Sequence, residues 1–252
     1  MKTVYFVGAG PGDPELITVK GQNLVKEGDI IIYAGSLVNE KILDCKKKDA
    51  KLYNSASMTL DEVLEVTERS LAKGEMVVRV HTGDPTIYGA IKEQIDALEE
   101  KGIRSVVIPG VSSFTASAAS LNRELTLPGV SQTVILTRLE GRTPVPELEK
   151  LESLARHQST MAIFLSVQMI DRVVEKLRTH YPEDTPIAVV QRATWEDQKQ
   201  VIGTLGEIGE KVKEAKISKT AQILVGRFLG EEYELSKLYD PKFTHEYREA
   251  KR

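Results

Sequence analysis

Three short stretches rich in glycine carry the residues of this sequence that are best suited to binding a small molecule. They read Gly8-Ala9-Gly10-Pro11-Gly12-Asp13-Pro14, His81-Thr82-Gly83-Asp84-Pro85 and Pro109-Gly110-Val111-Ser112-Ser113. Glycine lets the backbone turn tightly or lie close to a ligand. The second stretch adds a carboxylate and the third adds two hydroxyls, so each offers close approach together with polar groups.

The first stretch differs from the glycine pattern that binds dinucleotides. Asp13 stands where that pattern has its third glycine, and would place an anion beside a pyrophosphate. Pro11 also lacks the N–H group that a phosphate-binding loop would offer. We therefore predict a ligand other than a pyrophosphate, with a plain corner between strand and helix as the alternative.

Alternating apolar and amphipathic segments would position these stretches. In the first half we expect strands over 4–7, 29–33, 76–80 and 106–108, and helices over 16–27, 59–73, 88–100 and 114–121. Thr59 and Glu62 form a capping box at the start of one helix. The carboxyl ends of parallel strands face one crevice, so we expect the three glycine stretches to meet there.

The alternation breaks at Leu127-Pro128-Gly129. We therefore expect two α/β domains, an N-terminal one over 1–125 with a mainly parallel sheet and a C-terminal one over 126–252 with a mixed sheet. In the second half, strands are expected over 133–137, 162–165, 187–191, 200–204 and 222–226, and helices over 146–157, 169–180 and 205–215. The short segment over 193–197 suits the turn of a hairpin.

Composition excludes several classes of protein. The 252 residues are 41% hydrophobic and 28% charged with a net charge of −3, so no basic field indicates nucleic acid. The single Cys45 and four scattered histidines offer no metal-ligand spacing, and we expect no protein-bound metal. No apolar run is long enough to span a membrane, and a strand at the N-terminus leaves no room for a signal peptide. We expect a cytoplasmic protein.

With these residues in view, the chain resembles the tetrapyrrole methylases, which use S-adenosylmethionine (SAM). The glycine stretch at 8–14 resembles the family's first signature, the run over 80–89 its second, and that over 109–113 its third. Many relatives have Thr-Ala where this chain has Ser112-Ser113. The stretches over 33–38 (YAGSLV) and 140–147 (EGRTPVPE) resemble the branch that methylates C11 of precorrin-4, or of its cobalt form, in cobalamin biosynthesis.

The resemblance implies SAM as the methyl donor, a tetrapyrrole as the acceptor and a homodimer. It implies a SAM site between the domains, with contacts from Pro11, Gly83, Asp84, Ile87, Ser112 and Ser113, and from Leu165, Ala193, Ala221 and Gln222 of the second domain. Asp84 would bind the methionine ammonium, with a helix N-cap as the alternative.

Substrate and catalytic residues are harder to assign. The acceptor carries many carboxylates, which arginine binds bidentately, so Arg142 is the candidate substrate contact and Glu140 a candidate base. Tyr88 could form a wall of the site and His81 could carry a proton. Each also has a structural interpretation, as a surface ion pair or a core side chain, and the catalytic residue stays unknown. Trp195 is interpreted as capping an exposed turn.

Two other functions remain open. The same fold could methylate an earlier tetrapyrrole such as uroporphyrinogen, or a protein or RNA group. The glycine stretches could also belong to a nucleotide-binding module without methylation.

Overall fold

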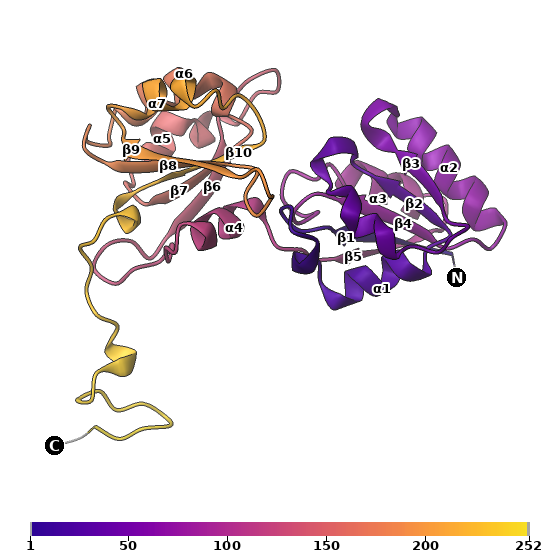
Figure 1. The fold of residues 1–252 in the computed structure, drawn as a ribbon, viewed down its shortest axis with the longest axis horizontal. Helices are drawn as coiled ribbons and strands as arrows, with labels where there is room; N and C mark the ends of the chain where they lie inside the picture. The colour runs from indigo at the N-terminus through magenta and orange to yellow at the C-terminus, as the bar shows by residue number, and fades with distance from the viewer. Residues whose placement is uncertain (1, 251–252) are drawn as a thin grey trace. The chain divides into compact units, whose positions relative to one another are not determined.

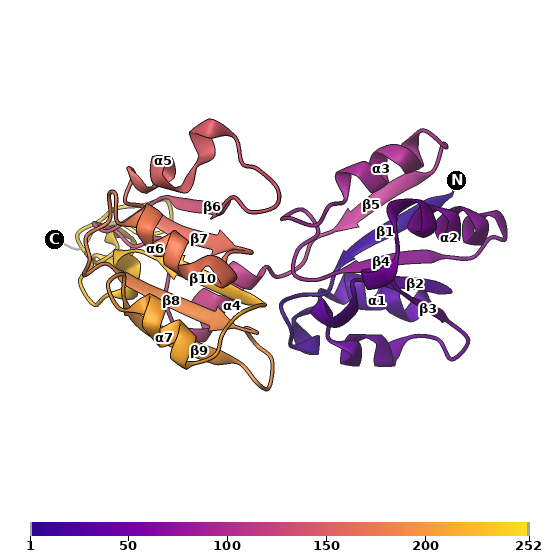
Figure 2. The same cartoon turned by 90° about the horizontal axis from the view of Figure 1, so that it is seen from above.

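The computed structural model describes residues 2–250, which form two compact units (Figure 1; Figure 2). The first unit contains the chain up to Ser117 together with Arg192–Gln198, and the second contains Ala118–Gln191 and the chain from Lys199 onward. The sequence places the change of domain at 125/126, but the structure divides within helix α4 (Ser113–Ser120). The start of α4 stays with the first unit, since it continues directly from the third glycine stretch.

The first unit is built on a parallel sheet, as expected. Its strand order is β3-β2-β4-β1-β5, and every neighbouring pair is parallel. The strands are β1 (Thr3–Gly8), β2 (Ile30–Tyr33), β3 (Lys51–Asn54), β4 (Val77–His81) and β5 (Arg104–Ile108). The isoleucines of β2 are buried, as a strand covered on both faces requires.

Helices cover both faces of this sheet. Helix α1 (Val19–Glu27) packs on one face, while α2 (Leu60–Ala72) and α3 (Lys92–Glu99) pack on the other. Along the strand order, the connection from β1 leads towards β3, to β2, whereas the connection from β4 leads the opposite way, to β5. Right-handed crossovers require opposite faces for opposite directions. The carboxyl ends of β1 and β4 are therefore the topological switch point, where open α/β sheets bind ligands.

Local signals set the ends of the helices. The Thr18 side chain caps α1, and Thr59 and Glu62 form the expected capping box at α2. Helix α3 begins at Lys92 rather than near Tyr88, because Tyr88 and Ala90 have positive φ angles that a helix does not allow.

The second unit has the expected mixed sheet, in the order β6-β7-β10-β8-β9. Strands β6 (Val134–Arg138) and β7 (Thr160–Phe164) are parallel, and β10 (Ala221–Val225) runs antiparallel to β7 and to β8 (Pro186–Gln191). Strand β9 (Lys199–Thr204) completes the expected hairpin with β8.

One face of the second sheet is covered by α5 (Leu151–Ala155), α6 (Ile170–Leu177) and α7 (Ile208–Glu214), all shorter than expected. Short 3₁₀ helices account for several of the remaining residues: Pro14–Leu16, Gly35–Leu37, Glu40–Cys45, Ser55–Ser57, Glu147–Glu149, Val167–Met169, Arg227–Leu229 and Lys237–Tyr239. Among the helices of residues 2–250, none has both the length and the apolar character that crossing a bilayer requires.

Candidate active site

The three glycine stretches meet at the carboxyl edge of the first sheet. Gly10 and Gly83 exchange backbone hydrogen bonds, with N–O distances of 3.2 Å and 2.8 Å. A Cβ atom added to Gly110 would lie 2.2 Å from the Gly83 oxygen and 2.9 Å from the Gly8 Cα. Backbone therefore packs directly against backbone here, which only glycine permits. The predicted convergence of the three stretches is confirmed.

Asp84 links the second stretch to the third. Its Oδ1 accepts hydrogen bonds from the Thr86 N–H at 2.8 Å and the Thr86 hydroxyl at 2.5 Å, and its Oδ2 accepts from the Gly110 N–H at 2.9 Å. Partial burial opposes ionisation, but these hydrogen bonds outweigh it and hold the pKa of Asp84 below its usual value. The carboxylate is thus an anion fixed in the loop, and its part in binding an ammonium stays a prediction.

The other predicted residues of these stretches lie around the same edge. Ser112 is buried, and its carbonyl accepts from Ala116 N at 3.1 Å, while Ser113 begins α4. Tyr88 has a φ of 54° and is 46% exposed. Backbone held at a positive φ in a residue other than glycine is often found at functional sites, so Tyr88 stays a candidate.

His81 ends β4 and is the first residue of the second glycine stretch. Its side chain is buried and stacks on Phe6, with ring centroids 5.9 Å apart. Burial, with the charge of Arg79 as a second cause, lowers the pKa of His81 to about 3. The imidazole is therefore neutral near pH 7, which disfavours the predicted role as a proton carrier.

The buried imidazole gives a pH prediction. An unfolded histidine binds a proton below about pH 6.5, whereas folded His81 binds one only below a pKa of about 3. Unfolding therefore takes up a proton between these values, so stability falls as the pH is lowered, by up to about 1.4 kcal/mol per pH unit. Denaturant unfolding of His81→Phe between pH 7.5 and 5 should show a smaller loss than the wild type. The exposed histidine variant His157→Gln should keep the wild-type loss, and an equal loss in His81→Phe would contradict the account.

Three predicted SAM residues of the second unit also share one edge. Leu165 follows β7 directly, with a φ of 53° and an exposed fraction of 72%. Ala221 and Gln222 begin β10, whose antiparallel register with β7 places them beside the end of that strand. Ala221 is half-buried and Gln222 buried. Ala193, expected from the second domain, lies in the first unit instead because residues 192–198 pack there.

The predicted substrate contact Arg142 and the predicted base Glu140 lie on the loop after β6, whereas Tyr88 follows β4. Arg138 Nη1 and Nη2 donate to the carbonyls of Thr143 and Pro144 at 3.1 Å and 2.8 Å, which fixes the loop. Glu140 lies 3.9 Å from Arg172 Nη2, and Arg142 is exposed. An exposed guanidinium on a fixed loop is available to bind a carboxylate.

Two residues that sequence analysis did not assign to the site hold the first glycine stretch. Asn39 Nδ2 donates to the Gly12 carbonyl at 2.8 Å, and Trp195 Nε1 donates to the Pro11 carbonyl at 2.8 Å. Asn39 is 27 residues away along the chain from Gly12 and Trp195 is 184 from Pro11. The interpretation of Trp195 as the cap of an exposed turn is wrong, because its side chain is half-buried and bonded to Pro11. The signal available was the presence of a large aromatic residue in a polar turn.

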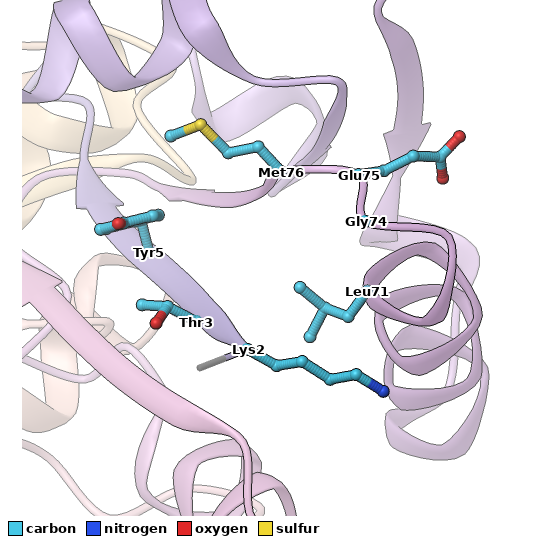
Figure 3. A pocket seen from close by; sticks show the side chains of 7 residues that line it. All are labelled: Lys2, Thr3, Tyr5, Leu71, Gly74, Glu75 and Met76. Atoms are coloured by element: carbon cyan, nitrogen blue, oxygen red, sulfur yellow. The ribbon is translucent and has the colours of Figure 1, made fainter.

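A separate hollow of about 360 Å³ lies at the opposite edge of the first sheet (Figure 3). Its lining residues are Lys2, Thr3, Tyr5, Leu71, Gly74, Glu75 and Met76. These precede or begin the strands, whereas the glycine stretches follow them, so the hollow is not part of the candidate site. Within residues 2–250, no three His, Cys, Asp or Glu side chains gather as metal ligands.

Comparisons of sequence identify relatives along nearly the whole chain. A family model described as Tetrapyrrole (Corrin/Porphyrin) Methylases matches residues 3–209. A Methanocaldococcus jannaschii protein named cobalt-precorrin-4 C(11)-methyltransferase is 61% identical, covering 99% of this chain and 97% of its own. A Pseudomonas aeruginosa protein named precorrin-4 C(11)-methyltransferase is 49% identical, covering 98% of each chain.

Solved structures agree with these matches. A cobalt precorrin-4 methyltransferase has a TM-score of 0.89 at 45% identity, covering 91% of this chain and 96% of that one. The uroporphyrin-III C-methyl transferase of Thermus thermophilus, solved in complex with S-adenyl homocysteine, has a TM-score of 0.76 at 27% identity, covering 90% and 98%. The family model and the relatives both extend over most of this sequence, and the three glycine stretches that resembled the family's signatures meet in its fold. The chain belongs to the family of tetrapyrrole (corrin/porphyrin) methylases.

Proposed function

We propose that this protein transfers a methyl group from SAM to C11 of cobalt-precorrin-4 during cobalamin biosynthesis. The observation that carries the proposal is the 61% identity, over nearly the full length of both chains, with a relative of that name. The metal-free precorrin-4 is the second candidate, because a relative at 49% identity is named for it.

The carboxyl edge of the first sheet fits the methyl donor. SAM combines an apolar adenosine, a sulfonium and an amino-acid end with an ammonium group. A Cβ added to Gly83 would make only an ordinary contact, 3.8 Å from the Ser112 Cα, so the backbone here is packed less tightly than at Gly110. Asp84 supplies the anion that an ammonium requires, and Tyr88 is an exposed ring. We therefore keep Pro11, Gly83, Asp84, Ile87, Ser112, Ser113, Leu165, Ala193, Ala221 and Gln222 as the proposed SAM contacts.

The reaction needs positioning more than activation. The methyl carbon forms a bond to the ring carbon as its bond to sulfur breaks, and the electron pair of that bond stays on sulfur. The sulfonium is already a good leaving group, and orienting two reactants can lower a barrier by about 7–11 kcal/mol. The backbone contacts of the glycine stretches suit this task, since they would hold the methyl donor in place without any side-chain motion. Glu140 is the proposed base for any proton that the acceptor loses.

Arg142 is proposed to bind a carboxylate of the acceptor. We expect Arg142→Ala to raise the KM for the tetrapyrrole about tenfold, because one charge-assisted hydrogen-bonded pair is lost. The Kd for SAM, measured by calorimetry, should not change. The matched control is Arg156→Ala, at another exposed arginine of the second unit. An unaltered KM in Arg142→Ala would remove this residue from the site.

The test of function is a methylation assay under exclusion of oxygen, read by mass spectrometry. The full chain receives SAM with uroporphyrinogen, precorrin-4 or cobalt-precorrin-4. A single added methyl group on cobalt-precorrin-4 alone supports the proposal, and one on precorrin-4 alone favours the metal-free substrate. Methylation of uroporphyrinogen alone overturns the choice of acceptor, and binding of NAD or ATP in place of SAM overturns the proposal altogether.

We also propose a homodimer, which the family resemblance supports, located in the cytoplasm, and neither a nucleic acid nor a membrane as partner. Light scattering on the purified protein measures the assembly.

A further inference from the structure

The connection between β8 and β9, residues Arg192–Gln198, packs against the first glycine stretch. Trp195 Nε1 donates to the Pro11 carbonyl at 2.8 Å, and Thr194 Oγ1 accepts from the Asp13 N–H at 3.0 Å. Two consecutive residues of the connection thus bind both sides of Gly12. The ion pair between Glu196 and Lys41, at 2.5 Å, adds a third link, but both side chains are exposed and such pairs contribute little.

The indole ring lies directly on the backbone of Gly12. A Cβ atom added to Gly12 would be 2.1 Å from Trp195 Cδ1 and 2.2 Å from Nε1. No side chain at this position can coexist with the ring in this place. The glycine here therefore serves the contact with Trp195, which is a different purpose from a close approach to a ligand.

The connection is itself held in a strained shape. Arg192 and Thr194 have φ angles of 51° and 71°, which cost energy for residues other than glycine. The Arg192 guanidinium lies 3.9 Å from the centroid of the indole, and its Nε donates to Asp197 Oδ1 at 2.7 Å. The Thr194 N–H donates to Gln198 Oε1 at 2.7 Å. These contacts stabilise the connection and the indole that it carries.

We propose that Trp195 is a positioning residue for SAM binding: it holds the first glycine stretch in the shape that receives the donor, without touching the donor itself. The inference rests on the proposed function, in which Pro11 lines the SAM site. The indole N–H donates to the Pro11 carbonyl. The orientation of the Pro11–Gly12 peptide, and of the pyrrolidine ring of Pro11, therefore depends on Trp195.

The first test removes the hydrogen bond while keeping an aromatic ring. We expect Trp195→Phe to weaken SAM binding about fivefold to tenfold in calorimetry, which is the effect of one lost hydrogen bond. Trp195→Ala should weaken it further. The KM for the tetrapyrrole should stay unchanged in both. The control Glu196→Gln, which removes only the neighbouring exposed charge, should bind SAM as the wild type does.

A double-mutant cycle then tests the contact itself. Gly12→Ala should destabilise the wild-type protein strongly in urea unfolding, and should cost much less in the Trp195→Ala background, where the ring no longer occupies the space. Trp195 is the one tryptophan of the sequence, so its emission in the wild type should also change when SAM is added.

The outcomes separate the two proposals. Unchanged SAM affinity in Trp195→Phe, or an equal cost of Gly12→Ala in both backgrounds, overturns the positioning role. A wild-type protein that binds no SAM overturns the proposed function, and the positioning role for SAM falls with it. The unfolding cycle, which needs no ligand, would then still show whether Trp195 holds the loop.

Discussion

Replacing Gly110 with alanine is expected to lower the free energy of unfolding by about 3 kcal/mol, the upper part of the range for overpacking. The new Cβ would lie 2.2 Å from the Gly83 oxygen and 2.9 Å from the Gly8 Cα. Both neighbours are backbone atoms at the ends of hydrogen-bonded strands, so neither can turn aside as a flexible side chain does. Urea unfolding followed by circular dichroism measures the effect.

The matched control is Gly141→Ala, whose added Cβ would meet only the Met169 Cε at 3.5 Å, an ordinary contact. It should change stability by less than about 0.5 kcal/mol. If Gly110→Ala proved as stable as the wild type, the three glycine stretches would not meet as closely as described. A folded Gly110→Ala protein should also bind SAM weakly, because parting the stretches displaces the groups that are proposed to bind it.

This meeting point was the most predictable part of the molecule. Glycine-rich stretches after buried apolar strands, with helices between them, indicate parallel strands whose carboxyl ends share one edge. The reciprocal hydrogen bonds of Gly10 and Gly83 follow from that arrangement. Local sequence was sufficient here because each glycine stretch directly follows its strand.

Sequence patterns do not predict elements that lack a run of apolar residues. Strand β3 (Lys51–Asn54) was not expected, since it is a short edge strand with three of its four residues exposed. Hydrophobic periodicity cannot identify such a strand, because its stabilisation comes from hydrogen bonds to β2. The late start of α3 was missed for a related reason: the positive φ angles of Tyr88 and Ala90 are imposed by the turn around Gly89. A Cβ there would lie 2.0 Å from the Pro85 oxygen.

A large aromatic residue in a polar turn is a signal that Trp195 packs on something, but the sequence does not identify the first glycine stretch as its partner. The two segments are separated by 184 residues, and a tryptophan in a polar turn gives no indication of its partner. The connection that carries the indole belongs to the first unit, although strands β8 and β9 on either side of it belong to the second. A single sequence thus predicts which residues follow a strand, but it does not predict which distant loop packs on those residues.

Asp84 is the residue whose substitution should harm the proposed site most. We expect Asp84→Asn to reduce SAM affinity more than tenfold, because the anion that would bind the ammonium is lost. It should also lower the free energy of unfolding by about 2 kcal/mol, since one amide oxygen cannot accept from Thr86 and Gly110 together. Calorimetry with SAM and urea unfolding measure the two effects.

The two roles of Asp84 can be separated with a ligand that lacks the amino-acid end, such as methylthioadenosine. If the carboxylate binds the ammonium, Asp84→Asn weakens SAM and leaves methylthioadenosine unaffected. If it only links the second and third glycine stretches, both ligands weaken together, because the whole edge is displaced. Thr86→Val serves as the control. It removes the hydroxyl that donates to Asp84, but it keeps the charge of the Asp84 carboxylate and the hydrogen bond from the Gly110 N–H. An equal loss for both ligands in Asp84→Asn would therefore assign this carboxylate to the loop and leave the ammonium to another group.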